Sequence, residues 1–271
     1  MDRQAGEAAR QRAADVLRRA AEEAGRAPSL LNAQPWRWHL GGDVLELHAD
    51  LSRLVGSIDP HRRLLTLSCG AALHHARVAL AAAGREPLVQ RLPDGRRPLL
   101  LARVRARQPH PVSRDDLVRY ESMHRRRTDR RPLRAAAPVP AETVAALEAT
   151  ADAEHASLYR IEPDVALGED ATDPPGPGEE RWAAYFVVAT EGDRPLDWLV
   201  AGEATSAVWL AATAEGLVMS PVRDAVERME ARTPLDRLFE PPARPQLVLR
   251  AGVDANPVPP PASPPRGVVD V

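Results

Sequence analysis

The segment APSLLNAQPWRWHL, residues 27–40, holds two of the five tryptophans of the chain within three positions of each other. In WRWHL, residues 36–40, apolar and polar residues alternate, which is the period-two pattern of a strand with one buried face. Packing in a protein core accounts for Trp36 and Trp38. The segment therefore predicts a core strand that is entered through a polar, proline-bearing loop.

The loop before this strand carries Ser29, Asn32 and Gln34. Core packing does not account for these three residues, because they are polar and spaced along an extended segment. Their hydroxyl and amide groups suit the polar edge of a ring or a sugar chain. We interpret this loop as a candidate ligand contact.

Length and composition indicate an ordinary globular protein. The 271 residues (29.5 kDa) are 44% hydrophobic and 27% charged, and they suffice for one large domain or two small ones. The net charge is −2 and all basic side chains are arginines, so the whole molecule does not attract nucleic acid or an anionic membrane. We found no signal-peptide pattern and no membrane-spanning run, and we expect a cytoplasmic protein.

Apolar periodicity and turn residues predict helices and strands in alternation. Strands 36–40 and 43–50 form one predicted hairpin, and 88–92 and 99–107 form another. Asp197 is the predicted N-cap of a long helix that stops at Gly216, and Ser220 with Pro221 are predicted to begin a further helix. An acidic, Pro/Gly-rich surface loop is expected at residues 163–180. The remaining expected helices are 3–24, 68–83 and 140–150, and the remaining strands are 155–162, 181–190 and 245–253.

Residues 119–134, RYESMHRRRTDRRPLR, contain seven arginines. One interpretation is a solvated helix face. A nucleic-acid patch is a second, although the aromatic residues that stack bases are missing around it. The third is a phosphate clamp, because arginine side chains bind phosphate oxygens in pairs and Thr128 adds a neutral donor.

Other catalytic patterns are weak. The adjacent His74 and His75 point to different sides of a helix and are expected to be core or surface histidines, not metal ligands. The single cysteine, Cys69, is expected to be a buried structural thiol. No GxGxxG, GxxxxGK[ST] or GxSxG sequence occurs. If the protein is an enzyme, its reactive atoms are expected to belong to a cofactor.

Two of these segments together resemble the nitroreductase superfamily. Residues 27–38 are similar to its P-S-x-x-N-x-Q-P-W segment, and RRTDRRPL, residues 126–133, is similar to its R-R-S-x-R-x-F phosphate-binding segment. Ordinary members carry these segments in the opposite order and pair two chains. The order found here resembles the tandem, Acg-like branch, in which one chain mimics the dimer. Residues 50–73, 201–221 and 264–271 also resemble segments of that branch or of the superfamily.

The resemblance implies an α+β, nitroreductase-like fold of two fused halves, residues 1–118 and 119–271, which form an intrachain pseudo-dimer with one FMN at their interface. A weak internal repeat between residues 75–84 and 206–216 is consistent with such halves. No catalytic side chain is implied. The implied cofactor contacts are Arg126, Arg127, Thr128, Arg130 and Arg266 at the phosphate, Ser29, Asn32 and Gln34 at the flavin, and backbone donors near Ser220 and Pro221.

The activity implied by the resemblance is ping-pong hydride transfer between NAD(P)H, or an organic substrate, and an acceptor such as a nitro compound, a quinone or an unsaturated metabolite. Two alternatives stay open: a flavin-binding protein that sequesters flavin without turnover, and a scaffold that has lost FMN. We expect a small-molecule substrate, no nucleic-acid or membrane partner, no metal, and a monomer or a homodimer.

Overall fold

The computed structural model describes residues 2–54, 56, 58–109, 111–129, 131, 133, 137–163, 182–222, 239–240, 242–253 and 269–270. The predicted site residues Arg130 and Arg266 lie outside the described residues. So does the predicted surface loop, apart from its first residue.

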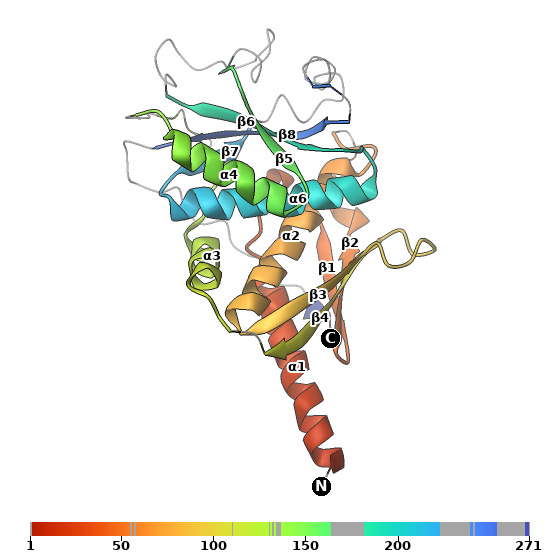
Figure 1. Ribbon diagram of the computed structural model, residues 1–271. Coiled ribbons are helices and arrows are strands. Elements are labelled where there is room, and N and C mark those ends of the chain that lie inside the picture. Colours follow the sequence, from red (N-terminus) through yellow and green to blue (C-terminus); the bar gives the residue numbers. More distant parts are fainter. Residues whose placement is uncertain are drawn as a thin grey trace.

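Four strands from the first part of the chain and the C-terminal strand β9 form a five-stranded sheet with the strand order β3-β4-β2-β1-β9. The hairpins β1–β2 and β3–β4 are antiparallel, as predicted from the turns. The C-terminal strand β9 joins the edge of this sheet, parallel to β1, so the chain end returns to its first sheet (Figure 1). The strands are β1 (Trp36–Gly41), β2 (Val44–Ala49), β3 (Arg85–Arg91), β4 (Leu100–Pro109) and β9 (Val269–Asp270).

The second part of the chain forms a four-stranded antiparallel sheet with the order β5-β6-β8-β7. Every residue of β6 is buried. Helices α4 and α6 lie side by side along this sheet (Figure 1), and both contact it. The elements are α4 (Ala141–Ala153), β5 (Ser157–Ile161), β6 (Ala184–Thr190), α6 (Pro195–Ala214), β7 (Val218–Pro221) and β8 (Arg244–Gly252).

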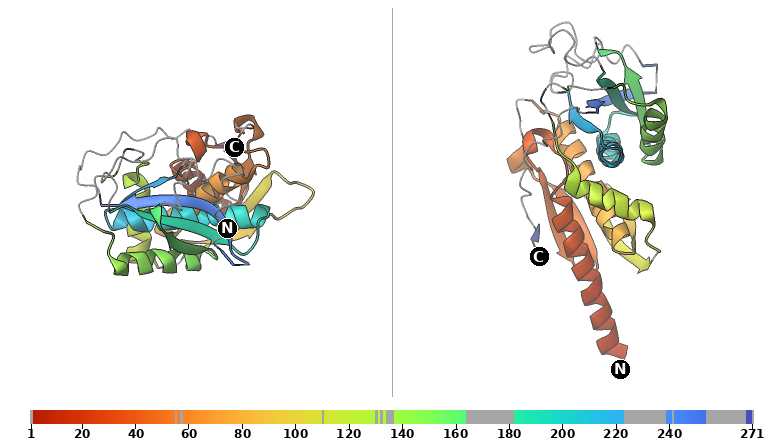
Figure 2. Two further views of the ribbon diagram at one scale, coloured as in Figure 1. Left: turned by 90° about the horizontal axis from the view of Figure 1, so that it is seen from above. Right: turned by 90° about the vertical axis from the view of Figure 1, so that its left-hand side faces the viewer.

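Helices α1 and α2 pack against the first sheet, and α2 and α3 contact α6 of the second part of the chain. Helix α1 (Asp2–Ala24) packs its C-terminal turns into the core and projects its N-terminus away from the body (Figure 2). Helix α3 (Arg114–Arg125) contacts both α2 and α6. Helix α2 (Arg63–Ala82) is buried over most of its length. By length and composition α2 is the one helix among the described residues that could cross a membrane, and it lies inside the core instead.

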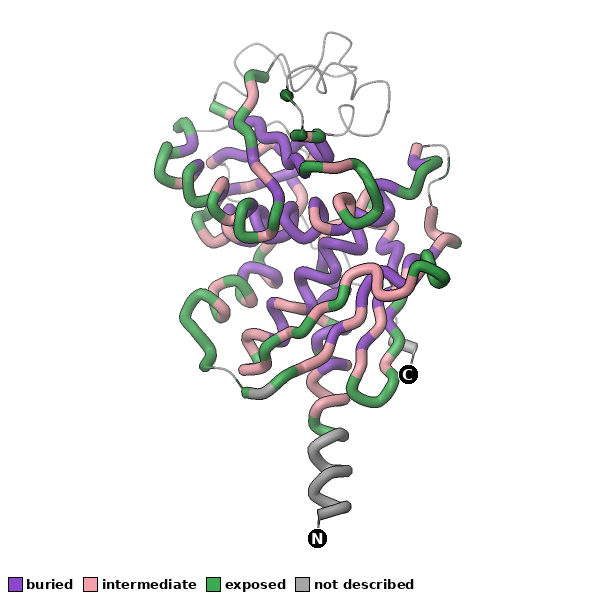
Figure 3. Tube along the Cα trace, turned by 45° about the vertical axis from the view of Figure 1, so that its right-hand side comes forward, coloured by how far each residue is buried: buried purple, intermediate pink, exposed green. Residues whose placement is uncertain are grey.

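Helices α2 and α6 cross at the centre of the molecule, where the buried residues concentrate (Figure 3). Gly70 lies seven residues after the start of α2, and Gly202 lies seven residues after the start of α6. A Cβ atom at Gly70 would collide with the carbonyl oxygen of Leu199, and one at Gly202 with that of Leu67. Leu67 and Leu199 are both four residues into their helices. The two helices therefore present the same positions to each other, as in a two-fold contact.

Most predicted elements are confirmed, but three helix starts are wrong. Helix α2 begins at residue 63, not 68, because the carboxylate of Asp59 accepts hydrogen bonds from the N–H groups of residues 64 and 65 at 3.1 and 2.8 Å. Asp197 is not the N-cap of α6. It lies in the first turn, where its carboxylate accepts from the Arg194 N–H at 2.9 Å. Ser220 and Pro221 do not start a helix but end β7, where pairing with β8 prevails over the local Ser-Pro signal.

A cluster of charged side chains around Glu46, on the first sheet, makes the stability of the protein depend on pH. Glu46 on β2 accepts hydrogen bonds from Arg103 Nε at 2.8 Å and Arg97 Nη2 at 2.9 Å. Burial opposes ionisation of this carboxyl, but the bonds from Arg103, Arg97 and His48 outweigh it and lower the pKa of Glu46 from 4.5 to about 2. Since the folded pKa is the lower one, the carboxylate stabilises the fold above about pH 4.5, and this contribution is lost as the pH falls toward 2.

Glu46→Gln should therefore lower the free energy of unfolding at neutral pH and have a much smaller effect near pH 2. Urea unfolding of both proteins between pH 7 and pH 2 measures this difference. A difference that stays constant over this range would contradict the assignment.

Candidate functional site: a pocket between the two central helices

A pocket of about 690 Å³, counting the part open to solvent, lies where α2 and α6 meet the loop before β1. We call it the central pocket. Its wall is apolar except for four hydroxyl side chains, and no charged residue lines it among the described residues. The lining residues are Pro28, Ser29, Leu30, Leu31, Leu64, Leu67, Ser68, Ala71, Thr128, Thr205, Trp209, Pro221, Val222 and Leu247.

Of the three polar residues singled out in the loop before β1, Ser29 lines the central pocket, whereas Asn32 and Gln34 do not. The side chain of Gln34 is buried and donates to Asn32 Oδ1 at 3.1 Å, while its backbone N–H donates to Ser29 Oγ at 3.0 Å. Leu31, Asn32 and Gln34 all have positive φ angles, of 50°, 56° and 48°. Such strain persists only where surrounding contacts hold it. In this structure Asn32 and Gln34 shape the loop that presents Ser29.

Helix α2 supplies one side of the central pocket. Leu64, Leu67, Ser68 and Ala71 follow the i, i+3, i+4, i+7 spacing of one helix face. Ser68 Oγ donates to the carbonyl oxygen of Leu64 at 2.8 Å and accepts from the N–H of Leu30 at 3.3 Å. The hydroxyl of Ser68 thus ties the loop to the helix.

The arginine segment reaches the central pocket through Thr128. Thr128 forms an isolated parallel bridge with Met219 of β7, which sets it beside the pocket-lining Pro221. The side chain of Arg250 on β8 holds the arginine segment in place, because its Nη2 donates to the carbonyl oxygens of Asp129 at 3.0 Å and Arg131 at 2.9 Å.

Arg126 lies at the edge of the central pocket. Its guanidinium stacks over the ring of Trp209, 5.1 Å from the centroid, and donates to Thr128 Oγ1 at 3.3 Å and to the carbonyl oxygen of Arg26 at 2.9 Å. Burial, together with the charge of Arg127, lowers the pKa of Arg126 to about 10. Among the described residues no carboxylate pairs with Arg126, and its buried Nε has no hydrogen-bond partner. Arg126 is thus a partly buried cation that lacks a counter-ion within the described part of the chain.

The other predicted residues are placed differently. Arg127 turns its guanidinium to the carbonyl oxygens of His124 and Arg126, at 2.7 and 2.8 Å, and does not line the central pocket. Ser220 Oγ accepts from Arg250 Nη2 at 3.2 Å and is also outside the lining. Thr205 and Trp209 also line the central pocket, and the sequence did not identify them as site residues. Their spacing of four residues on one helix was the available signal, but nothing local showed which face of α6 meets the pocket.

Cys69 and the paired histidines lie in the core. The Cys69 thiol donates to the carbonyl oxygen of Pro35 at 3.3 Å, and burial raises its pKa. Burial lowers the pKa values of His74 and His75 well below the usual range. Both histidines contact Ser206 Oγ at 2.9 Å through Nδ1. None of these groups lines the central pocket.

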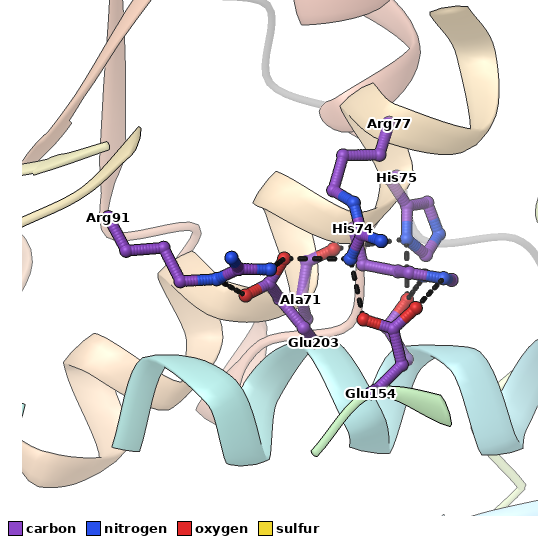
Figure 4. Close-up of polar contacts among 8 residues, drawn as sticks. Ala71, His74, His75, Arg77, Arg91, Glu154 and Glu203 are labelled. Carbon is purple, nitrogen blue, oxygen red and sulfur yellow. Dashed lines mark hydrogen bonds and ion pairs between the residues drawn. The ribbon is translucent and has the colours of Figure 1, made fainter. Parts of the chain in front are cut away.

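A buried charge network lies beside these histidines (Figure 4). Glu203 of α6 accepts hydrogen bonds from Arg77 Nη1 at 2.8 Å and from Arg91 Nε and Nη2 at 2.6 and 3.0 Å. Arg77 also donates to Glu154, which follows α4, at 2.5 Å. The network links α2 and β3 to α4 and α6. Within the described residues, no group of three or more His, Cys, Asp or Glu side chains could hold a metal ion.

The central pocket combines an apolar slot, hydroxyl groups and one adjacent cation. An apolar slot between helices suits a planar, uncharged ring, and a guanidinium without a carboxylate beside it suits an anionic group attached to that ring. The residues present therefore fit a flavin mononucleotide, which has a planar ring and a phosphate.

Comparison with known proteins gave several long sequence relatives, among them two from Mycobacterium tuberculosis strain H37Rv. The first, "Putative NAD(P)H nitroreductase Rv3131", is 32% identical and aligns with 91% of this chain and 88% of its own length. The second, "Putative NAD(P)H nitroreductase acg", is 30% identical and aligns with 94% of each chain.

Among solved structures, a putative NADH dehydrogenase/NAD(P)H nitroreductase from Bacteroides thetaiotaomicron matches 52% of this chain and 89% of its own, with 17% identity and a TM-score of 0.41. No protein-family model matches the sequence. Because the identity to the first relative extends over nearly the whole of both sequences, this chain belongs to the NAD(P)H nitroreductase family.

Proposed function

We propose that the protein is an FMN-dependent oxidoreductase of the nitroreductase type, with FMN in the central pocket. The observation that carries the proposal is Arg126, a partly buried guanidinium with no carboxylate partner among the described residues, which contacts the pocket-lining Trp209 and Thr128. Removing this charge from part of its water without a counter-ion is unfavourable, and a bound phosphate would compensate it. Family membership supports the same assignment.

FMN, when bound, would accept a hydride from NAD(P)H or an organic substrate and pass it to a nitro compound, a quinone or an unsaturated metabolite. Arg126 and Thr128 would hold the phosphate, and Ser29 would donate its hydroxyl hydrogen to the ligand, because its oxygen already accepts from Gln34. Leu64, Leu67 and Trp209 would cover the ring and exclude water. Arg127, Arg130 and Arg266 stay predicted phosphate contacts.

In this proposal, Pro221 at the end of β7 and the adjacent Val222 supply no backbone hydrogen-bond donor to the flavin. Pro221 has no N–H group, and the N–H of Val222 donates to the carbonyl oxygen of Val248 at 2.9 Å. Pro221 therefore cannot donate to a ring, and Val222 could do so only by giving up its bond to Val248. We therefore assign Pro221 and Val222 an apolar contact with the flavin.

We further propose that the chain is an intrachain pseudo-dimer with a single flavin site. The reciprocal contact of α2 and α6 at Gly70 and Gly202 supports it, as does the pocket that both helices line. Purified protein saturated with FMN should carry one flavin per chain, measured by absorbance after removal of free flavin. Two flavins per chain would contradict the proposal.

Arg126→Gln should weaken FMN binding by about 1–3 kcal/mol, because it removes the cation from the phosphate and leaves an amide. Titration of flavin fluorescence with wild-type and variant protein measures the loss. Arg105→Gln, at an exposed arginine of β4, is the matched control and should bind FMN as the wild type does.

Turnover is tested separately from binding. Anaerobic NAD(P)H should bleach the flavin absorbance, and a nitroaromatic compound or a quinone should restore it. Binding of FMN without bleaching would favour the alternative of a flavin-sequestering protein. A preparation that takes up no FMN would rule out both flavin functions.

A further inference from the structure

Thr205 of α6 is a pocket residue whose hydroxyl group has no partner among the described residues. The residue is 2% exposed and lines the central pocket. Its Oγ1 atom is buried and makes no hydrogen bond within the described part of the chain. A buried hydroxyl without a partner is rare in native proteins, and each case requires an explanation.

Other hydroxyl residues on the helices of this protein make a local hydrogen bond that Thr205 lacks. Thr66, Ser68, Thr150 and Thr213 each donate to the carbonyl oxygen four residues earlier, at 2.7 to 2.8 Å. This local bond is open to any serine or threonine inside a helix. Thr205 does not make it to Ala201. Its side chain thus loses water without gaining the hydrogen bond that its own helix offers.

A second buried polar atom without a partner in the described residues lies at the same pocket. It is Nε of Arg126, whose guanidinium stacks on Trp209, one helical turn beyond Thr205. The charge of Arg126 suits the phosphate. The hydroxyl of Thr205, which can donate and accept, suits a neutral polar atom of the ring.

We propose that Thr205 orients the flavin by a hydrogen bond from its hydroxyl group to a polar edge atom of the isoalloxazine ring. This inference rests on the proposed binding of FMN in the central pocket. The oxygen is covered in this structure, so this hydrogen bond requires a rotation about χ1, which exchanges the methyl and hydroxyl positions. Within the described residues, no hydrogen bond opposes that rotation.

The proposal predicts that removal of the Thr205 hydroxyl weakens FMN binding but does not destabilise the flavin-free protein. Thr205→Val keeps the shape of the side chain and removes the hydroxyl. FMN should then bind about tenfold more weakly, because the ring atom loses its partner. The absorbance bands of the bound flavin should shift. The melting temperature of the flavin-free protein should stay the same or rise, because a buried polar group without a partner has been removed.

Two further variants complete the experiment. Thr205→Ser restores the hydroxyl and should bind FMN within about threefold of the wild type. Thr213→Val removes a buried hydroxyl of the same helix, which donates to the Trp209 carbonyl oxygen and lies outside the pocket lining. It should lower the melting temperature and leave FMN affinity unchanged.

Fluorescence titration with FMN, absorbance spectra and thermal unfolding of the flavin-free proteins supply the readouts. Unchanged affinity and spectrum in Thr205→Val would overturn this inference while leaving the proposed function standing. A lower melting temperature of flavin-free Thr205→Val would also overturn it, because it would show a structural role. If the wild type takes up no FMN, the proposed function fails and this inference fails with it.

Discussion

Gly202→Ala is expected to destabilise the protein by more than about 3 kcal/mol, because overpacking against a backbone atom leaves little room for relaxation. The new methyl group would collide with the carbonyl oxygen of Leu67, which is part of α2 and not a flexible side chain. The two central helices would have to separate. Because both line the central pocket, FMN binding should be lost as well. Urea unfolding and flavin titration measure the two effects.

The contact at Gly202 has a reciprocal partner and a matched control. Gly70→Ala should have an effect of similar size, since its Cβ would collide with the carbonyl oxygen of Leu199. A Cβ at Gly41, at the end of β1, would meet nothing within 4 Å. Gly41→Ala should therefore change stability by less than about 0.5 kcal/mol. Equal stabilities of the Gly202 and Gly41 variants would contradict the tight crossing of α2 and α6.

Glu203→Gln is expected to cost about 3 kcal/mol of stability, the range observed when one partner of a buried ion pair is removed. The Glu203 side chain is 1% exposed and faces the guanidinium groups of Arg77 and Arg91. Burial alone would lower the pKa of Arg77, but the charges of Glu203 and Glu154 outweigh it and raise this pKa. A neutral amide would leave Arg91 without its carboxylate and Arg77 with Glu154 alone.

An exposed ion pair supplies the control for Glu203. Asp43 lies 3.9 Å from Arg105, and both side chains are largely in water. Asp43→Asn should change the free energy of unfolding by less than about 1 kcal/mol, because solvent screens the pair. Urea unfolding of the two variants side by side tests the difference. If both variants were equally stable, the network of Glu203 would contribute nothing beyond a surface ion pair.

Local patterns predicted most of the fold. The alternation in WRWHL became β1, the two turns became hairpins, and the apolar runs became α2 and α6. These predictions succeed because each element buries one face or stripe, and the spacing of its apolar residues records which. The predicted starts of α2 and α6 were wrong, and so was the helix predicted from the Ser-Pro signal at β7. In each case another group competes with the local signal: Asp59 at α2, the bond from Arg194 to Asp197 at α6, and pairing with β8 at β7.

The sequence also predicted part of the candidate site and failed for the rest. Ser29, Thr128 and Pro221 come from segments that the sequence had singled out, and the structure brings them to one pocket. Asn32 and Gln34 belong to the same motif as Ser29, yet they bond within the loop. No local pattern separates a polar residue that faces a ligand from one that supports the loop, because both are polar and both are held by hydrogen bonds.

The sequence by itself determined the kinds of elements, their apolar faces and the two segments whose order pointed to fused halves. The tertiary structure alone decided that Gly70 and Gly202 meet, that Arg126 has no carboxylate within the described residues, and that the Thr205 hydroxyl has no hydrogen-bond partner among them. The physical reason is that burial and the loss of hydrogen-bond partners arise where segments distant in sequence pack together, and the periodicity of a single segment does not encode its neighbour.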